Sequence, residues 1–122
     1  MASNDSILKT IRVVSGLPDD DTSFDDDLKL YINGALANLN QVGATLDSTN
    51  VIDDTATWSS ITLPSPVIQA FVKLYVLTST RLNFDPPAPS ALSYMTASLN
   101  ETLWRVGVEV DKYRKEEVVD GA

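Results

Sequence analysis

The sequence predicts an all-α protein: a small four-helix bundle with a long loop between the second and third helices and an extended C-terminal tail. Two observations support this fold class. Apolar residues recur at helical spacing in four segments, and stretches rich in glycine, proline or aspartate separate these segments. With 122 residues, of which 43% are hydrophobic, the chain is long enough to bury a core as one domain.

The first helix is expected over residues 5–15. Ser3 or Asn4 can cap its N-terminus, and Gly16 supplies the left-handed residue that commonly ends a helix. We expect its apolar side to face the core and the polar segment 17–22 that follows to be a turn-rich linker. The apolar side consists of Ile7, Leu8, Ile11 and Val14.

The second helix is expected over residues 24–42 and ends at Gly43. Ser23, followed three positions later by Asp26, approximates a capping box, and the helix dipole favours the acidic residues of this first turn. A single apolar face, about 80° wide at 100° per residue, predicts that this helix packs on the core. Its members are Phe24, Leu28, Tyr31, Ile32, Ala35, Leu39 and Val42.

Segment 44–63 has no helical period and contains mainly small, β-branched and polar residues, so we expect a long loop that is functional or mobile. The third helix begins with Ser65 as its cap and Pro66 at its first position. This helix is apolar nearly all round, which predicts that it lies at the centre of the bundle. Its narrow polar stripe consists mainly of Gln69, Lys73 and Thr80.

Three prolines within residues 86–89 must end the third helix near Phe84, because proline cannot continue a helix. Ser90 then offers its hydroxyl as the N-cap of a fourth helix, expected over about 91–108. Gly107 marks a point where this helix can end or bend. The apolar stripe of the fourth helix consists of Leu92, Met95, Leu99, Leu103 and Val106, and Val110 is a further candidate member.

The composition excludes most catalytic chemistry. The chain contains neither histidine nor cysteine, which rules out Ser/His/Asp and Cys/His nucleophilic arrangements, thiolate metal sites and disulfides. It also has no glycine-rich phosphate loop. A pair of carboxylates is enough for a glycosidase, but nothing in the sequence indicates a substrate cleft. We therefore expect no enzyme, no catalytic residue and no cofactor.

The acidic residues near the first linker do not form a calcium loop. Counting from Asp19, Phe24 and Leu30 occupy the positions where an EF-hand needs glycine and glutamate, so no metal is expected. The formal charge of −8 argues against binding to nucleic-acid phosphates. The sequence has no signal peptide and no segment long enough to span a bilayer, which predicts a soluble protein made inside the cell.

The two tryptophans raise the question of contact surfaces. Trp104 lies about 120° from the core-facing stripe of its helix, so it either anchors an interface or covers one end of the core. Trp58, in the polar loop, is expected to fold back on its own domain. Arg105 is either a solvated surface charge, which is the commoner case, or a cation that bridges subunits.

The sequence predicts a helical domain over residues 1–110 and a C-terminal tail over 111–122. The tail is charged and weakly apolar, but Tyr113 and two valines give it something to bury, so we expect it to become ordered on a partner. The candidate partner-contacting residues are Trp104, Arg105, Val108, Val110, Tyr113, Arg114, Lys115, Val118 and Val119.

Three segments carry a resemblance to a known family: 24–32 (FDDDLKLYI), 82–87 (LNFDPP) and 99–106 (LNETLWRV). Together with the order of the helices and the proline corner before the last long helix, they resemble the head–tail adaptor (connector) proteins of long-tailed double-stranded DNA bacteriophages. The resemblance covers most of the chain.

This resemblance implies a small all-α structural protein of the virion neck, assembled in the host cytoplasm. It implies a ring of twelve copies beneath the portal that extends the DNA channel toward the tail. The implied partners are the portal protein, further copies of the chain, and a neck stopper or tail-completion protein. DNA would pass through without specific binding, no membrane would be involved, and the C-terminal segment would grip the portal.

The charge of the chain is compatible with a DNA channel. Twelve copies at −8 each carry −96, and an acidic lumen offers DNA no ion pairs. Apolar area buried between subunits must offset their repulsion, so we expect an isolated monomer that assembles on the portal. Two other functions stay open at this point: an acidic DNA mimic that occupies a basic groove, and a small helical protein-binding regulator.

Overall fold

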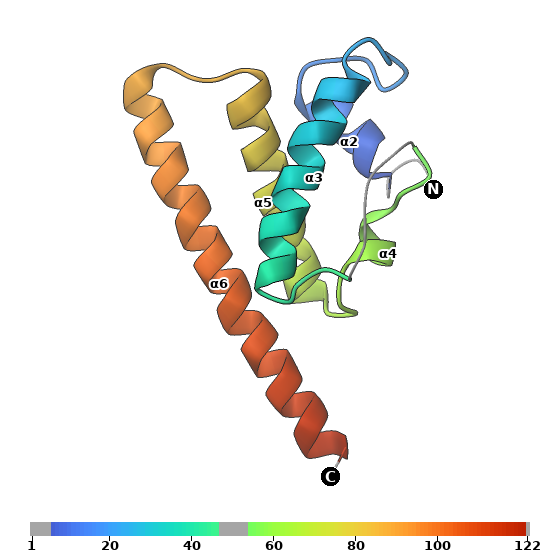
Figure 1. Ribbon diagram of the computed structural model, residues 1–122, viewed down its shortest axis with the longest axis vertical. Helices are drawn as coiled ribbons and strands as arrows, with labels where there is room; N and C mark the ends of the chain where they lie inside the picture. The colour runs from blue at the N-terminus through green and yellow to red at the C-terminus, as the bar shows by residue number, and fades with distance from the viewer. Residues whose placement is uncertain (1–5, 47–53, 122) are drawn as a thin grey trace.

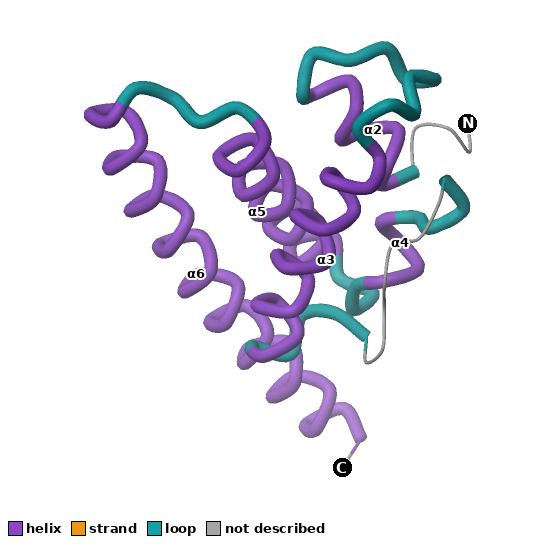
Figure 2. Tube along the Cα trace, turned by 45° about the horizontal axis from the view of Figure 1, so that its top comes forward, coloured by secondary structure: helices purple, strands orange, loops and turns teal. Residues whose placement is uncertain are grey.

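The computed structural model describes residues 6–46 and 54–121, with side chains described as far as residue 116. It confirms the all-α class: the described residues contain helices and two isolated β-bridges but no strand. Three long helices, α3 (Asp25–Gln41), α5 (Pro66–Phe84) and α6 (Pro89–Gly121), run antiparallel in sequence order (Figure 1). The short helices α2 (Ile7–Val14) and α4 (Trp58–Ile61) lie on the side away from α6, as the tilted view also shows (Figure 2).

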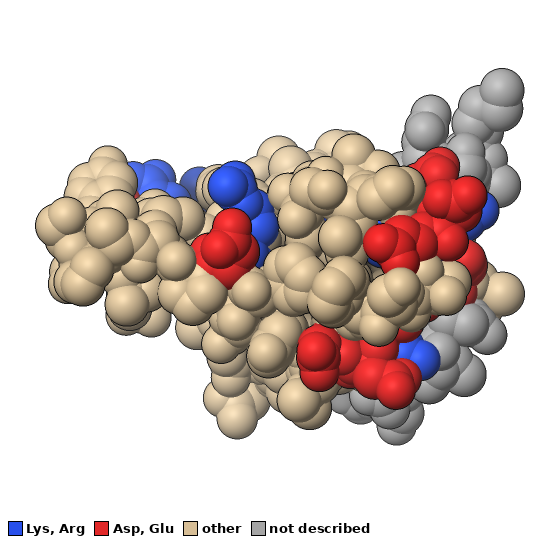
Figure 3. Space-filling model, turned by 90° about the horizontal axis from the view of Figure 1, so that it is seen from above, with Lys and Arg blue, Asp and Glu red and all other residues tan. Residues whose placement is uncertain are grey.

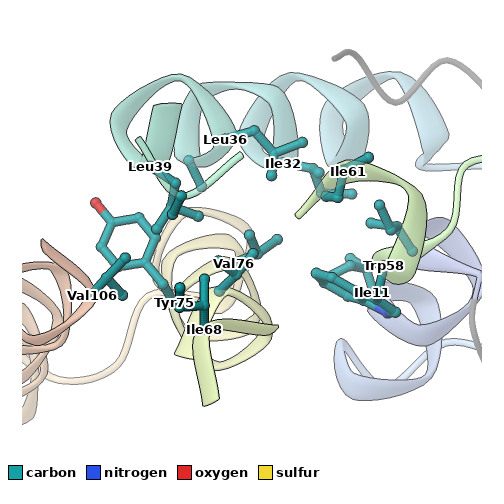
Figure 4. Packing of buried hydrophobic residues seen from close by; sticks show 14 of the residues in the cluster. Ile11, Ile32, Leu36, Leu39, Trp58, Ile61, Ile68, Tyr75, Val76 and Val106 are labelled. Carbon is teal, nitrogen blue, oxygen red and sulfur yellow. The ribbon is translucent and has the colours of Figure 1, made fainter. Parts of the chain in front are cut away.

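Helix α5 occupies the centre of the molecule, as the sequence predicts. It packs against each of the other four described helices, and Val72 and Val76 are completely buried at its inner side. Figure 4 shows the core from close by, with side chains from α3, α5 and α6 meeting on one side and those from α2 and α4 on the other. One apolar cluster therefore joins all five helices.

The prediction of which side of α5 faces solvent is partly wrong. Thr80 is fully buried, whereas Val67 and Leu74 are each half exposed. The apolar pattern of α5 runs nearly all round, so the sequence alone did not distinguish the inner face from the outer one. The outer face of this central helix is left apolar and uncovered.

Two glycines end helices as predicted, whereas the N-cap of the first helix is a different residue from the ones predicted. Gly16 and Gly43 have φ of +87° and +83°, the left-handed conformation that ends α2 and α3. The N-cap of α2 is Ser6, whose hydroxyl accepts a hydrogen bond from the Lys9 amide at 3.3 Å. The predicted caps Ser3 and Asn4 lie outside the described residues.

The capping box predicted at the start of the second helix does not form. The N-cap of α3 is Phe24, which makes no side-chain cap. The Ser23 amide instead donates to the Asp21 carboxylate at 2.9 Å, which closes a turn one step earlier in the chain. The backbone hydrogen bond from Ser23 is the largest cause of the lowered pKa of Asp21, and the interaction with the Ser23 side chain is the next.

The segment expected to be a long loop contains the short helix α4, which has a capping box of its own between Thr57 and Ser60. Trp58 is only 5% exposed and belongs to the core, so the prediction that it folds back on its own domain is confirmed. Antiparallel bridges pair Thr45 with Thr62 and Ser6 with Thr57. Residues 47–53 of the expected loop lie outside the described residues.

Helix α5 ends at Phe84, as predicted, but the cap predicted for the last helix is wrong. Helix α6 begins at Pro89, one residue before Ser90, because proline fits the first helical position, where its missing N–H is not needed. The first helical hydrogen bond runs from the Leu92 amide to the Ala88 carbonyl at 2.8 Å. The prolines at 86, 87 and 89 thus form the corner between two antiparallel helices.

Helix α6 is also longer than predicted. It continues through Gly107 to Gly121, where the sequence predicted an end near Val108. The single glycine costs helix stability but does not stop the helix, and the charged residues after it are good helix formers. The division of the chain into residues 1–110 and 111–122 stays a prediction.

Candidate interaction surfaces

Helix α6 presents Trp104 to solvent, because the inner side of this helix is taken by Val106. Val106 is completely buried and lies beside Tyr75 and Ile68 of α5 (Figure 4). Two residues along a helix correspond to a rotation of about 200°, so Trp104 points to the opposite side. Its side chain is 68% exposed, which removes the alternative that it covers the core.

Arg105 lies on the solvent side of α6 and pairs with a residue of its own helix. Its guanidinium Nη2 is 2.8 Å from the Glu101 carboxylate, four residues earlier. More than half of each side chain is exposed, and such a pair contributes only about 0.3–0.5 kcal/mol to the free energy of unfolding. In the single chain, Arg105 is therefore a solvated surface charge.

Two of the predicted contact residues serve the chain's own core. Val110 is 2% exposed, and Tyr113 is half-buried against the same cluster. Val108 is half-buried on α6, and Lys115 is exposed. The side chains of Val118 and Val119 lie outside the described residues, although α6 itself extends past them.

Arg114 connects the last part of α6 to the end of α3. A Cβ built on Gly43 would lie 2.8 Å from Nη2 of Arg114 and 3.4 Å from Cγ1 of Val110. The absence of a side chain at Gly43 thus allows α6 to pass close to the backbone at the end of α3. A guanidinium is also favourable there, because a helix C-terminus carries partial negative charge.

An apolar groove lies on the outer face of α5, and the sequence analysis did not single it out. It has a volume of about 440 Å³, and its lining carries no charged side chain. We call it the α5 groove; its lining residues are Pro66, Val67, Ala70, Phe71 and Leu74. The signal was present in the sequence, since a helix apolar nearly all round needs cover on every side.

The start of α6 is exposed but uncharged, which is unusual for a surface helix. No charged residue occurs from position 86 to 100, and Tyr94 is 77% exposed. Figure 3 shows the acidic side chains gathered at the opposite side of the molecule, where the linker after α2 and the start of α3 lie. The first part of α6, up to Asn100, is therefore uncharged, whereas charged side chains of both signs follow from Glu101 onward.

A buried arginine organises the acidic side. Arg12 is 1% exposed, and its guanidinium donates to both carboxylate oxygens of Asp25, at 2.9 and 2.6 Å. It also donates to the Asp19 carbonyl at 2.7 Å and pairs with Asp54 at 3.0 Å. The hydrogen bond to Asp25 is the largest cause of the raised pKa of Arg12, which stays charged. Nothing local in the sequence indicates this role of Arg12, because its carboxylate partners lie 13 and 42 residues away.

Two further properties bear on the kind of site. Across residues 6–46 and 54–121, no group of three or more acidic side chains is placed to hold a metal ion. Among the helices described, none combines the length and the apolar character that a membrane span requires.

The comparison with protein families identifies the relatives of the chain. The model of the phage connector protein family matches residues 7–113, from the first residue of α2 to the last third of α6. The chain belongs to the phage connector protein family. No curated protein and no solved structure matches this connector.

Membership confirms the resemblance drawn from the sequence and shows a structural role for this connector in a phage. Connectors act at the neck of the virion, where they contact portal and tail components. The match includes Trp104, Arg105, Val108, Val110 and Tyr113, whereas Arg114, Lys115, Val118 and Val119 lie beyond its end.

Proposed function

We propose that this connector assembles as a ring beneath the portal and extends the DNA channel toward the tail, acting by assembly without catalysing a reaction. The observation that carries the proposal is the family match together with α6. This helix has 33 residues, about 50 Å at 1.5 Å per residue, and its C-terminal end runs past the rest of the molecule (Figure 1). A rigid arm of this kind suits contact with a second protein.

The end of α6 is the part that we assign to the portal. Arg114 and Tyr113 still contact the body of the chain, so the helix leaves the body only after them. The residues that follow in sequence, Lys115, Val118 and Val119, then meet the portal, with the two valines as apolar anchors. A neck stopper or tail-completion protein takes the opposite end of the ring.

The charge distribution supports a passive channel. A ring of twelve copies carries −96, which gives DNA phosphates no ion pairs to hold them during passage. The acidic DNA mimic receives no such support. Asp25 and Asp54 are engaged by Arg12, and most of the acids seen in Figure 3 gather at one side of the molecule. The acids of α6 are interspersed with basic residues, so they form no extended acidic face.

Co-sedimentation with portal rings of the same phage tests the proposal. We expect wild-type protein to sediment with the rings and the double variant Val118→Asp/Val119→Asp to stay in the supernatant. Val13→Asp is the control, because Val13 is 58% exposed on α2, far along the chain from the arm. The proposal would be overturned if the wild-type chain stayed in the supernatant while the portal rings sedimented, and if no density for it were seen at the virion neck.

A further inference from the structure

The outer face of α5 lacks a partner within the chain. Leu74 is half exposed and lies two residues, or about 200°, from the fully buried Val72, so it points away from the core. The α5 groove collects these outward apolar side chains over two turns of the helix. A central helix with an apolar outer face is the sign of a surface that is covered in the assembled state.

The outer face of α6 carries a large exposed apolar side chain. Trp104 projects from it with 68% of its side chain in solvent. Because Val106 faces α5 and Trp104 is turned about 200° from it, the indole points away from α5 and its groove. The chain therefore carries an open apolar groove on α5 and an exposed indole on α6 that face different ways.

A closed ring requires this kind of pair. Neighbours in a ring contact each other head to tail, so each copy must offer two different surfaces that fit together. A rotation without translation closes the ring, so the two surfaces must lie at the same height along the ring axis. Helices α5 and α6 are antiparallel and meet at the proline corner, and Trp104 is as many residues from the start of α6 as Gln69 is from the end of α5. Trp104 therefore lies at about the level of the α5 residues that line the groove.

Charge points to the same pairing. Two copies at −8 each repel, so the contact between them is expected where neither contributes net negative charge. The acidic side chain one turn before Trp104, Glu101, is paired with Arg105 at 2.8 Å. The lining of the α5 groove is uncharged, and Trp is among the side chains that most often anchor interfaces. A second copy of this chain satisfies the shape, the level and the charge at once.

We propose that the α5 groove of one copy receives Trp104 of the next copy, and that this contact closes the ring. The inference rests on the proposed function, because it names the subunit contact of the same ring. It makes Trp104 a residue that contacts a neighbouring connector, while the end of α6 contacts the portal.

Engineered disulfides test the contact directly, because the chain has no cysteine of its own. Trp104→Cys and Leu74→Cys variants are mixed at high protein concentration, oxidised and separated without reductant. A disulfide needs Cα atoms within about 7 Å, so it reports this pairing specifically. We expect a covalent dimer from the mixture and a ladder of larger species from the double variant. The control is Leu30→Cys, which is as exposed as Trp104, at 69%.

Two results would overturn the pairing. One is a mixture that yields no more Trp104→Cys/Leu74→Cys dimer than the Leu30→Cys control does. The other is a Trp104→Cys variant that dimerises with itself more readily than with Leu74→Cys, which would indicate a symmetric contact in place of a head-to-tail one.

Charge substitutions provide a second measurement. At the high protein concentration needed for the free chain to self-associate, Trp104→Glu and Leu74→Glu are each expected to weaken self-association by about thirtyfold or more in analytical ultracentrifugation, while Leu30→Glu leaves it unchanged. A mixture of the first two variants restores a dimer, because each retains one intact surface. If rings form but neither variant affects them, the proposed contact is wrong, while the proposed ring assembly still holds. If the wild-type protein forms no ring alone or with portal, the proposed function itself fails.

Discussion

Arg12 and Asp25 form a two-point contact between helices that are separated by an acidic linker. Nε and Nη2 of Arg12 each donate to one oxygen of the Asp25 carboxylate, and the remaining guanidinium nitrogen, Nη1, donates to the Asp19 carbonyl of the linker. Asp54 approaches the same guanidinium from a segment 42 residues further along. One cation thus fixes the start of α3, the linker and the segment before α4.

Replacing Arg12 tests how much this contact contributes. Arg12→Met leaves the Asp25 carboxylate, which is 17% exposed, without its partner, and we expect a loss of about 2–4 kcal/mol in the free energy of unfolding. Urea denaturation measures it. Asp26→Asn is the matched control, because Asp26 is fully exposed and its pair with Lys29 is 3.6 Å long. The control should change stability by less than about 0.5 kcal/mol.

The contrast between the two tryptophans gives the second prediction. Trp58→Ala removes a side chain that is 5% exposed and is expected to cost about 3–5 kcal/mol. Trp104→Ala removes one that is 68% exposed, and the isolated chain should keep its stability within about 0.5 kcal/mol. Thermal unfolding at low protein concentration measures both. A large loss for Trp104→Ala in the monomer would show that the indole serves the chain's own fold.

Glycine at position 43 is required by the backbone, whereas glycine at position 34 is not. Gly43→Ala forces a side chain into φ of +83° and toward Arg114, so we expect a loss of about 1–2 kcal/mol. Gly34 lies inside α3 with open space around it, and Gly34→Ala should add about 0.5–1 kcal/mol. Chemical denaturation of the two variants side by side gives changes of opposite sign.

Thr80 carries a buried hydroxyl without a hydrogen-bond partner. Its Oγ1 accepts from and donates to no group of the described residues, and the side chain is fully buried. Thr80→Val keeps the shape and removes the unpaired hydroxyl, so the free energy of unfolding should rise by about 1 kcal/mol.

The control for that substitution is Thr62→Val. Thr62 is equally a core residue, but its hydroxyl donates to the Trp58 carbonyl at 3.3 Å. Losing this bond should lower stability by about 0.5–1.5 kcal/mol. If both variants moved in the same direction by the same amount, hydrogen bonding would not be the cause.

Local signals predicted the ends of the helices better than their side-chain caps. The Ser65–Pro66 start of α5, the glycine ends of α2 and α3, and the proline corner each depend on a few adjacent residues, and the structure has all of them. The resemblance to connectors also depended on local segments, and the family match confirms it.

Long-range features were not accessible in the same way. The role of Arg12 depends on Asp54, which only the folded chain brings near, and the covered and bare faces of α5 look alike in the sequence. Ser90 and Pro89 both favour a helix start, and no local rule decided between them. The exposure of Trp104 needed the position of Val106, which its neighbours on α5 determine.

The unbroken course of α6 couples its C-terminal end mechanically to its middle. Gly121 and Trp104 belong to the same rigid rod and are about 25 Å apart along it. A grip on the lower end therefore sets the azimuth and tilt of the indole at the same time. Docking on a symmetric portal would orient Trp104 of every copy at the same angle, so that the portal would act as a template for closing the ring.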